Sequence, residues 1–161
     1  MKKVSLDSTA VVYDSFDELS EEDQLLLQKA IAATKTSYAP YSNFKVGACV
    51  YLENGQYITG SNQENAAYPS GICAERVAVW KAGTDYPGVK ILKIGITATS
   101  EHKDVDKPVG PCGACRQSML EYEVDQKEPI KVLFMGEVGK VVAVSSVTSL
   151  LPFSFDGSYL S

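Results

Sequence analysis

The sequence predicts a three-layer α/β/α fold built around a five-stranded mixed sheet. Apolar and polar residues alternate from Phe44 to Leu52, which is typical of a β-strand. An apolar stripe at helical spacing precedes this strand, and helical and strand patterns alternate through the rest of the chain. Such alternation favours helices packed on both faces of one sheet. With 161 residues, 45% of them hydrophobic and 22% charged, the chain suits one domain with a single core.

We expect this single domain to span residues 1–161, with residues 1–19 as an N-terminal extension. The extension contains Val4, Leu6 and the apolar run at 10–13, which are compatible with one short strand. That strand is not one of the five expected in the sheet.

A helix and a hairpin are expected next. Ser20, followed by acidic residues, predicts a helix start, and the helix is expected to continue toward Thr36 and to end by Ala39-Pro40. The Phe44 strand and a second strand at 56–62 are joined by Asn54-Gly55, a strong hairpin signal. The apolar stripe of the helix consists of Leu26, Leu27, Ala30 and Ile31.

The second half of the chain predicts two helices and three strands. One helix begins at Cys73 and is expected to end at Gly83, and another runs from Cys112 to about Glu123. The strands lie at 91–99, 130–135 and 140–145, and the last two are expected to form an antiparallel hairpin.

Two short cysteine blocks carry the strongest chemical signal. Cys73 is followed by Ala-Glu-Arg, and Cys112 and Cys115 lie in the block Pro-Cys-Gly-Ala-Cys-Arg. Three thiols suit a borderline-soft metal such as zinc, and catalytic zinc sites keep three protein ligands and an open fourth position. The Glu75 carboxylate, two residues after the first thiol, is placed to act at that open position. The pattern therefore predicts a catalytic zinc site with one ion per chain.

The spacing of the thiols also predicts their electrostatic surroundings. Cys112 and Cys115 project to one face of a helix, and Pro111 suits a first helical turn. Two helix N-termini at one point would favour thiolates. Arg76 and Arg116 are expected to donate hydrogen bonds to the thiolates and to offset their charge, unless they are ordinary surface residues.

Two other readings of the cysteines stay open. A closed structural site would need Cys49 or His102, the only histidine, as a fourth ligand. Cys49 lies within a predicted strand, where a thiol is more often part of the core, and His102 lies in a charged stretch typical of a loop. A disulfide between Cys112 and Cys115 would leave Cys73 unexplained.

Composition argues against several classes of partner. The net charge is −5 with a pI near 4.9, and no block of lysine and arginine is present to follow phosphates, so we expect no nucleic-acid partner. No stretch is apolar enough for a signal peptide or a membrane span, so we expect no membrane association. Thiol ligands fit a reducing cytoplasm.

The chain resembles the zinc-dependent cytidine deaminases of the small homo-oligomeric type. The resemblance rests on Tyr-Ala-Pro-Tyr-Ser-Asn-Phe-Lys-Val-Gly-Ala from Tyr38, Asn-Gln-Glu-Asn from Asn62, the two cysteine blocks with Arg116-Gln117, and Leu-Leu-Pro from Leu150 with Phe155. A closely related signature is established in zinc nucleobase deaminases, so the roles of metal and acid below are carried over from the family.

The resemblance implies a hydrolytic deamination of cytidine and deoxycytidine in pyrimidine salvage. Cys73, Cys112 and Cys115 would hold zinc, and Glu75 would move a proton from water to the ring N3 and assist the departing amine. The resemblance also implies the substrate contacts. Asn62 and Glu64 would bond the sugar hydroxyls, and Phe44 would pack on the base. Backbone groups around Ala74 would read the pyrimidine, and Phe155 would enter a neighbouring subunit's site. The resemblance therefore implies that this protein assembles into a homotetramer with shared active sites.

Each substrate contact also has a plainer explanation. By pattern alone Phe44 is a core residue, Asn62 and Glu64 are solvated, and Phe155 seals the edge of one subunit. A non-catalytic structural zinc module and a blasticidin-type nucleoside antibiotic deaminase remain as alternatives, although the latter type lacks the Asn-x-Glu-Asn block. A deoxycytidylate or nucleic-acid deaminase would typically have histidine in place of Cys73.

Overall fold

The sheet has six strands, one more than the sequence predicts. In the computed structural model, which describes residues 1–3 and 8–160, the strands are arranged in the order β1-β6-β5-β4-β2-β3. The additional strand β1, Ala10–Tyr13, lies in the N-terminal extension and pairs antiparallel with β6, Val141–Val144. The five-strand prediction was therefore wrong because a short strand joins the sheet edge; Val4 and Leu6 lie outside the described residues.

The sheet is mixed, as expected, because one pair of its strands is parallel. β4 (Ile91–Ser100) runs parallel to β5 (Lys131–Met135), and the remaining neighbours are antiparallel. β2 (Phe44–Leu52) lies between β4 and β3 (Tyr57–Ser61), with Phe44 opposite Ser100. The start of β2 therefore lies at the same end of the sheet as the carboxyl ends of β4 and β5.

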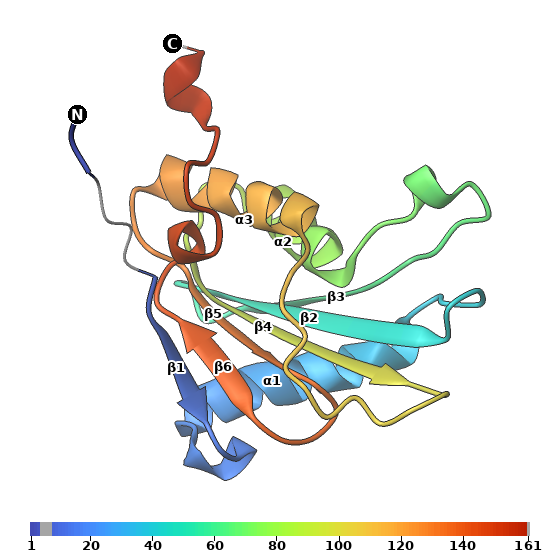
Figure 1. The fold of residues 1–161 in the computed structure, drawn as a ribbon. Helices are drawn as coiled ribbons and strands as arrows, with labels where there is room; N and C mark the ends of the chain where they lie inside the picture. The colour runs from blue at the N-terminus through green and yellow to red at the C-terminus, as the bar shows by residue number, and fades with distance from the viewer. Residues whose placement is uncertain (4–7, 161) are drawn as a thin grey trace.

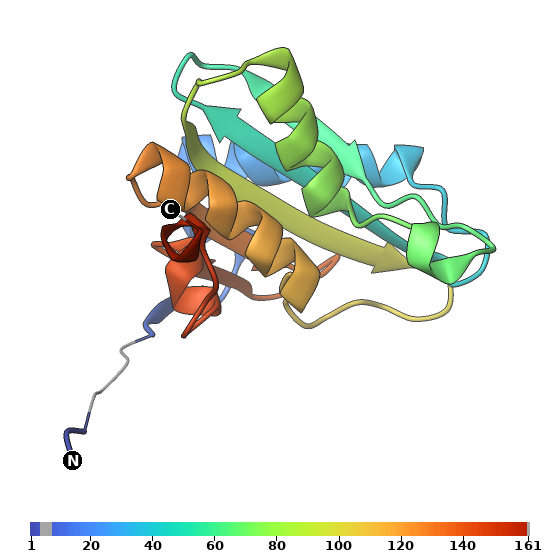
Figure 2. The same cartoon turned by 90° about the horizontal axis from the view of Figure 1, so that it is seen from above.

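Helices cover both faces of the sheet, which confirms the three-layer prediction (Figure 1). α1, Glu21–Ala33, packs on one face, and Ser20 caps it by accepting a hydrogen bond from the Asp23 N–H at 3.3 Å. α2, Ala74–Asp85, and α3, Gly113–Gln126, lie side by side on the other face (Figure 2). The alternation of β2 divides the core accordingly, since Ala48, Val50 and Leu52 pack beneath α2 and α3 while Cys49 packs with α1.

Two glycines allow α2 to approach its neighbours closely. A Cβ at Gly60 of β3 would lie 2.5 Å from the Ala78 nitrogen and 2.6 Å from the Ala74 oxygen, both in the backbone of α2. Gly83 does not end α2, as its sequence context suggested. It lies within the helix, where a Cβ would come within 2.6 Å of the Tyr122 hydroxyl on α3. Glycine at these positions therefore sets the location of α2, and with it the start of the helix at Cys73.

The segment after β6 runs back across α3. A 3-10 turn at Val147–Leu150 follows the sheet, and the chain ends in a second one at Gly157–Tyr159. Figure 2 shows this segment beside α3. Within the described ranges, none of the helices is both long enough and apolar enough to cross a bilayer.

Candidate active site

Three thiols meet where α2 and α3 begin. Cys73 is the N-cap of α2, Cys112 is the N-cap of α3, and Cys115 lies in the first turn of α3. The Sγ atoms of Cys73 and Cys112 are 3.9 Å apart, those of Cys112 and Cys115 are 3.5 Å apart, and all three lie within 4.8 Å of one another. Tetrahedral zinc with Zn–S bonds of about 2.3 Å requires sulfurs roughly 3.8 Å apart. The predicted ligand set therefore fits zinc in both donor type and spacing.

Neither candidate for a fourth ligand joins this cluster. In the part of the chain that the structure describes, the metal-binding group consists of the three cysteines alone. Cys49 is fully buried on the α1 side of the sheet, where burial raises the pKa of its thiol to about 12. His102 Nε2 lies 3.1 Å from the side-chain nitrogen of Asn43. All four cysteines are free in this structure, and no disulfide joins Cys112 to Cys115, whose sulfurs are 3.5 Å apart.

The helix starts contribute partial positive charge to the cluster. The thiols of Cys73 and Cys112 make no capping hydrogen bond, which leaves both sulfurs available to a metal beside unpaired helix N–H groups. Pro111 lies one residue before the N-cap of α3 and not within its first turn, which corrects that part of the sequence interpretation.

The two arginines act differently. The Nη2 of Arg76 donates to the Cys73 sulfur at 3.8 Å, as predicted. This guanidinium and the Cys115 thiol lower the pKa of Cys73, the Cys115 contact being the larger cause, although partial burial opposes them. Arg116 instead donates from Nε to the Pro111 carbonyl and from Nη1 to the Leu150 carbonyl, both at 2.8 Å. Its described hydrogen bonds thus fasten the Cys112 loop to the C-terminal segment and do not reach a thiolate.

Glu75 lies beside the thiols and is almost fully buried, with 4% of its surface exposed. Burial is the main cause that raises the pKa of its carboxyl, and the negative charge of Cys73 adds to the effect. Buried carboxyl groups of this kind hold a proton more readily than surface ones, which is the property that general acid–base chemistry requires.

A cavity of about 830 Å³ opens beside Cys73, Glu75 and Cys112. Its wall brings together most of the residues that the sequence analysis singled out. Besides those three, the cavity is lined by Phe44, Asn62, Glu64 and Arg76. Phe44 is half-buried, and its side chain faces this cavity at the beginning of β2.

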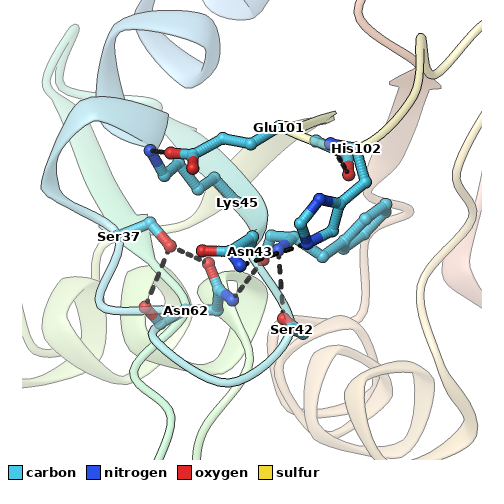
Figure 3. A network of polar contacts seen from close by, with 9 residues as sticks. Ser37, Ser42, Asn43, Lys45, Asn62, Glu101 and His102 are labelled. Carbon is cyan, nitrogen blue, oxygen red and sulfur yellow. Dashed lines mark hydrogen bonds and ion pairs between the residues drawn. The ribbon is translucent and has the colours of Figure 1, made fainter.

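Most of the donors and acceptors of the Asn62 side chain are already hydrogen-bonded, mainly to the start of β2 (Figure 3). Its Oδ1 accepts from the Ser37 hydroxyl at 2.5 Å and from the Val46 N–H at 2.8 Å, while its Nδ2 donates to the Phe44 carbonyl at 2.9 Å. Both lone pairs of the oxygen are used, so one N–H of the amide remains for a ligand.

Glu64 is bonded to the loop that precedes β2. Its Oε2 accepts from the backbone N–H groups of Tyr41 at 2.9 Å and Ser42 at 3.3 Å, and its Oε1 accepts from the Ser42 hydroxyl. The Ser42 hydroxyl and the Tyr41 N–H lower the pKa of this carboxyl, which keeps it a carboxylate acceptor. One lone-pair position of Oε1 is left for a ligand.

Two predicted contacts lie outside the cavity wall. Ala74 is fully buried in the first turn of α2. Phe155 is 56% exposed on the C-terminal segment, where its ring stacks on Tyr159 and its carbonyl accepts from the Gln117 side chain at 2.8 Å.

Sequence reasoning missed the serines that hold Asn62 and Glu64. Ser37 and Ser42 bond these two side chains from positions more than 20 residues earlier in the chain. The only available signal was local: Ser42 lies two residues before Phe44, a spacing at which a serine hydroxyl often accepts a backbone N–H.

The chain is similar to known cytidine deaminases over most of its length. Residues 20–127 match the family described as the cytidine and deoxycytidylate deaminase zinc-binding region. Cytidine deaminases from Halalkalibacterium halodurans and Sporosarcina psychrophila are 38% and 36% identical; the alignments cover 82% and 84% of this chain and 92% and 93% of those proteins. The crystal structure of cytidine deaminase from Burkholderia pseudomallei superposes with a TM-score of 0.71 at 37% identity, covering 85% of this chain and all of the other.

The match covers more than half of the chain and includes all three predicted zinc ligands. Both the donor set and the fold agree with it. The chain therefore belongs to the family of zinc-dependent cytidine and deoxycytidylate deaminases.

Proposed function

We propose that this protein hydrolyses the exocyclic amine of cytidine and deoxycytidine, releasing uridine or deoxyuridine and ammonia. The observation that carries the proposal is a buried carboxyl group, Glu75, beside three thiols at zinc spacing, where Glu75, Cys73 and Cys112 line a cavity large enough for a nucleoside. The similarity to cytidine deaminases supports the same substrate class.

Cys73, Cys112 and Cys115 would hold one zinc ion. When bound in such a site, zinc supplies Lewis acidity and lowers the pKa of water toward neutrality. Three thiolates donate more negative charge than the ion carries, which works against that acidity. Arg76, through its bond to Cys73, and the two helix N-termini would offset part of this excess.

Glu75 would be the proton carrier of the reaction. Its burial favours transient protonation, and its place in the cavity wall allows it to take a proton from the hydrolytic water and deliver it to N3 of the pyrimidine. Protonation of N3 makes C4 more electrophilic, and a second transfer to the amine improves the leaving group. Phe44, half-buried in the wall, would pack on the base, and backbone groups around Ala74 would read its polar edge.

Asn62 and Glu64 would bind the sugar. Their remaining capacity is one N–H donor and one carboxylate acceptor, which suits a hydroxyl group that accepts from one and donates to the other. This contact would orient the nucleoside with its base toward the thiols.

Phe155 supports a further proposal of assembly into a homotetramer with shared active sites. Phe153, Phe155 and Tyr159 are 88%, 56% and 70% exposed on the C-terminal segment, and exposed aromatic groups of this kind are typical of subunit contacts. A mass by light scattering equal to one chain in an active preparation would contradict the tetramer. We also place the enzyme in pyrimidine salvage in the cytoplasm, where thiol ligands stay reduced.

The decisive experiment follows the loss of cytidine absorbance with purified protein, with and without a metal chelator. We expect turnover that the chelator removes and zinc restores. Glu75→Gln should keep about one zinc per chain, since the thiols are unchanged, and lose nearly all turnover. Glu121→Gln, an exposed acid on α3, is the matched control and should behave as the wild type. Full activity of Glu75→Gln would refute the proton-carrier role, and inactivity of the zinc-loaded wild type would refute the function.

A further inference from the structure

The loop at 39–43 follows α1 and the short 3-10 turn at Thr34–Thr36 and leads into β2. Hydrogen bonds of its own residues hold it in one conformation. Asn43 adopts a left-handed backbone with φ of 53°, and its N–H donates to the Ala39 carbonyl at 3.0 Å. Its side-chain nitrogen lies 3.1 Å from Nε2 of His102, beyond the end of β4 (Figure 3). The loop is thus closed upon itself and connected to the neighbouring strand, which fixes the residue before Asn43.

That residue, Ser42, connects two of the proposed substrate contacts. Its hydroxyl oxygen accepts from the Phe44 N–H at 3.0 Å, and its hydroxyl hydrogen is donated to Oε1 of Glu64. Its own backbone N–H also donates to Oε2 of Glu64 at 3.3 Å. Ser42 therefore contacts both oxygens of the Glu64 carboxylate and the backbone from which the Phe44 ring projects.

The Ser42 hydroxyl determines which part of Glu64 is available to a ligand. Oε2 accepts from two backbone N–H groups, while Oε1 accepts from Ser42 alone among the residues that the structure describes. A carboxylate offers about four lone-pair positions, so the free one lies on Oε1, next to the serine hydroxyl. Without that hydroxyl, the carboxylate would keep its backbone contacts but would lose the contact that fixes the rotation of Oε1.

We infer that Ser42 is a positioning residue for nucleoside binding, which aims Oε1 of Glu64 at a sugar hydroxyl. This inference rests on the proposed function, because it assigns the cavity to a nucleoside. It places Ser42 on the binding side of the reaction, since the hydroxyl makes none of its described contacts with the thiols or Glu75.

The test compares Ser42→Ala with wild type on two substrates, cytidine and 2′,3′-dideoxycytidine, which lacks the 2′- and 3′-hydroxyls. We expect Ser42→Ala to raise KM for cytidine about tenfold and to leave kcat within about twofold, because one charge-assisted hydrogen bond is misdirected. KM for dideoxycytidine should be the same in both proteins. Ser42→Thr, which keeps the hydroxyl, should restore the cytidine KM. Ser118→Ala is the control, since that hydroxyl donates to the Ala114 carbonyl of its own helix.

A double-mutant cycle tests the route of the effect. In a Glu64→Ala background, Ser42→Ala should add no further rise in KM, because the group that it aims is gone. An equal rise with both substrates would show a general loosening of the loop and overturn the inference, as would an unchanged cytidine KM. If Ser42→Ala does not fold, Ser42→Cys, a close isostere with a weak donor, carries the same comparison.

Binding of the products separates this inference from the proposed function. Calorimetric titration with uridine and 2′,3′-dideoxyuridine repeats the comparison without turnover. A wild type that binds uridine but does not deaminate cytidine would defeat the proposed function. The inference would then be tested by affinity alone: Ser42→Ala should bind uridine about tenfold more weakly than wild type and should bind 2′,3′-dideoxyuridine as tightly as wild type does. A wild type that binds neither nucleoside would defeat both.

Discussion

Replacing Glu123 with alanine removes the acceptor of five hydrogen bonds, of which four fasten the chain after β6 to α3 and one holds Ile130, just before β5. The side chain is 7% exposed, and it accepts the N–H groups of Ile130 at 2.8 Å, Val147 at 2.7 Å and Thr148 at 2.9 Å. It also accepts the hydroxyls of Ser146 and Thr148, both at 2.6 Å. The segment that starts at this anchor continues to Phe155.

The expected cost follows from the donors that the substitution leaves without an acceptor. Thr148 N–H keeps the Ser146 hydroxyl at 3.1 Å, and the hydroxyls can turn to water. The N–H groups of Ile130 and Val147, whose residues are fully buried, lose the acceptor that Glu123 supplies. At about 1–3 kcal/mol for each unpaired buried donor, Glu123→Ala should lower the free energy of unfolding by about 2–6 kcal/mol.

Glu123→Gln should cost less, because the two hydroxyls can reverse and accept from its amide. Ile130 and Val147 share Oε2, whereas Ser146 and Thr148 bond Oε1. A carbonyl at Oε2 and an NH₂ at Oε1 therefore preserve the bonds from the Ile130 and Val147 N–H groups, whereas the Thr148 N–H loses its bond to Oε1 and keeps the Ser146 hydroxyl as acceptor. We expect a loss of about 1–2 kcal/mol at pH 7, the difference between a charged and a neutral acceptor.

The same anchor predicts a pH dependence. Burial raises the pKa of Glu123, but the Ser146 and Thr148 hydroxyls and the backbone donors outweigh it, so the folded-state pKa lies below the usual value. Its stabilising contribution is therefore present above the unfolded-state pKa of about 4.3 and is lost as the pH falls through the folded-state pKa. The difference in the free energy of unfolding between wild type and Glu123→Gln should therefore become smaller below about pH 4.

Urea unfolding at pH 7 and at steps down to acid measures both effects, with exposed Glu121→Ala as the control. A loss smaller than about 1 kcal/mol for Glu123→Ala would show that water replaces the carboxylate without penalty and would refute the accounting of donors. If the difference in unfolding free energy between wild type and Glu123→Gln stays constant into the acid range, the pKa argument is refuted.

Three further outcomes follow from the packing and the metal site. Gly60→Ala should lower the free energy of unfolding by about 1–3 kcal/mol in urea titrations, because its Cβ meets the backbone of α2, whereas Gly157→Ala, with open space around it, should change nothing measurable. Cys49→Ala should retain the zinc content of the wild type by atomic absorption while Cys115→Ala loses it, and equal loss in both would revive a four-cysteine site. Asp23→Asn should destabilise by about 1–3 kcal/mol by thermal or urea unfolding, because the carboxylate bonds Lys93 at 2.7 Å and Lys131 at 2.6 Å; no change would mean that this pair adds nothing.

The elements that the sequence predicted well are those with a strong local pattern. The alternation along β2 predicted both its bounds and the division of its side chains between the two cores, since that division follows from the period of a strand alone. The spacing of Cys112 and Cys115 also determined their shared face, because both lie within one turn of α3. The sheet and the helices packed on it bring Cys73 to the other two cysteines, so local spacing could not predict this contact. A zinc site was nevertheless predicted because the sequence offered few other roles for three thiols.

The features that the sequence analysis missed depend on tertiary contacts. β1 has only four residues and gains its strand geometry from pairing with β6. Gly83 lies within α2, and the close approach of the Tyr122 hydroxyl explains the glycine at this position. Arg116 follows a ligand closely in sequence, but the Leu150 carbonyl, 34 residues away, determines where its guanidinium points.

Asn62 and Glu64 show why polar residues at a strand end are hard to assign from a pattern. Both are expected to bind the sugar, yet most of their hydrogen bonds hold the start of β2 and the loop before it. What remains is one donor and one acceptor, which suit a single hydroxyl that accepts from Asn62 and donates to Glu64. We therefore expect deoxycytidine to be deaminated with a kcat/KM within about threefold of cytidine, and 2′,3′-dideoxycytidine to lose about tenfold or more. A large preference for cytidine over deoxycytidine would mean that another group reads the second hydroxyl, and the count of free donors and acceptors at this pair would no longer describe sugar recognition.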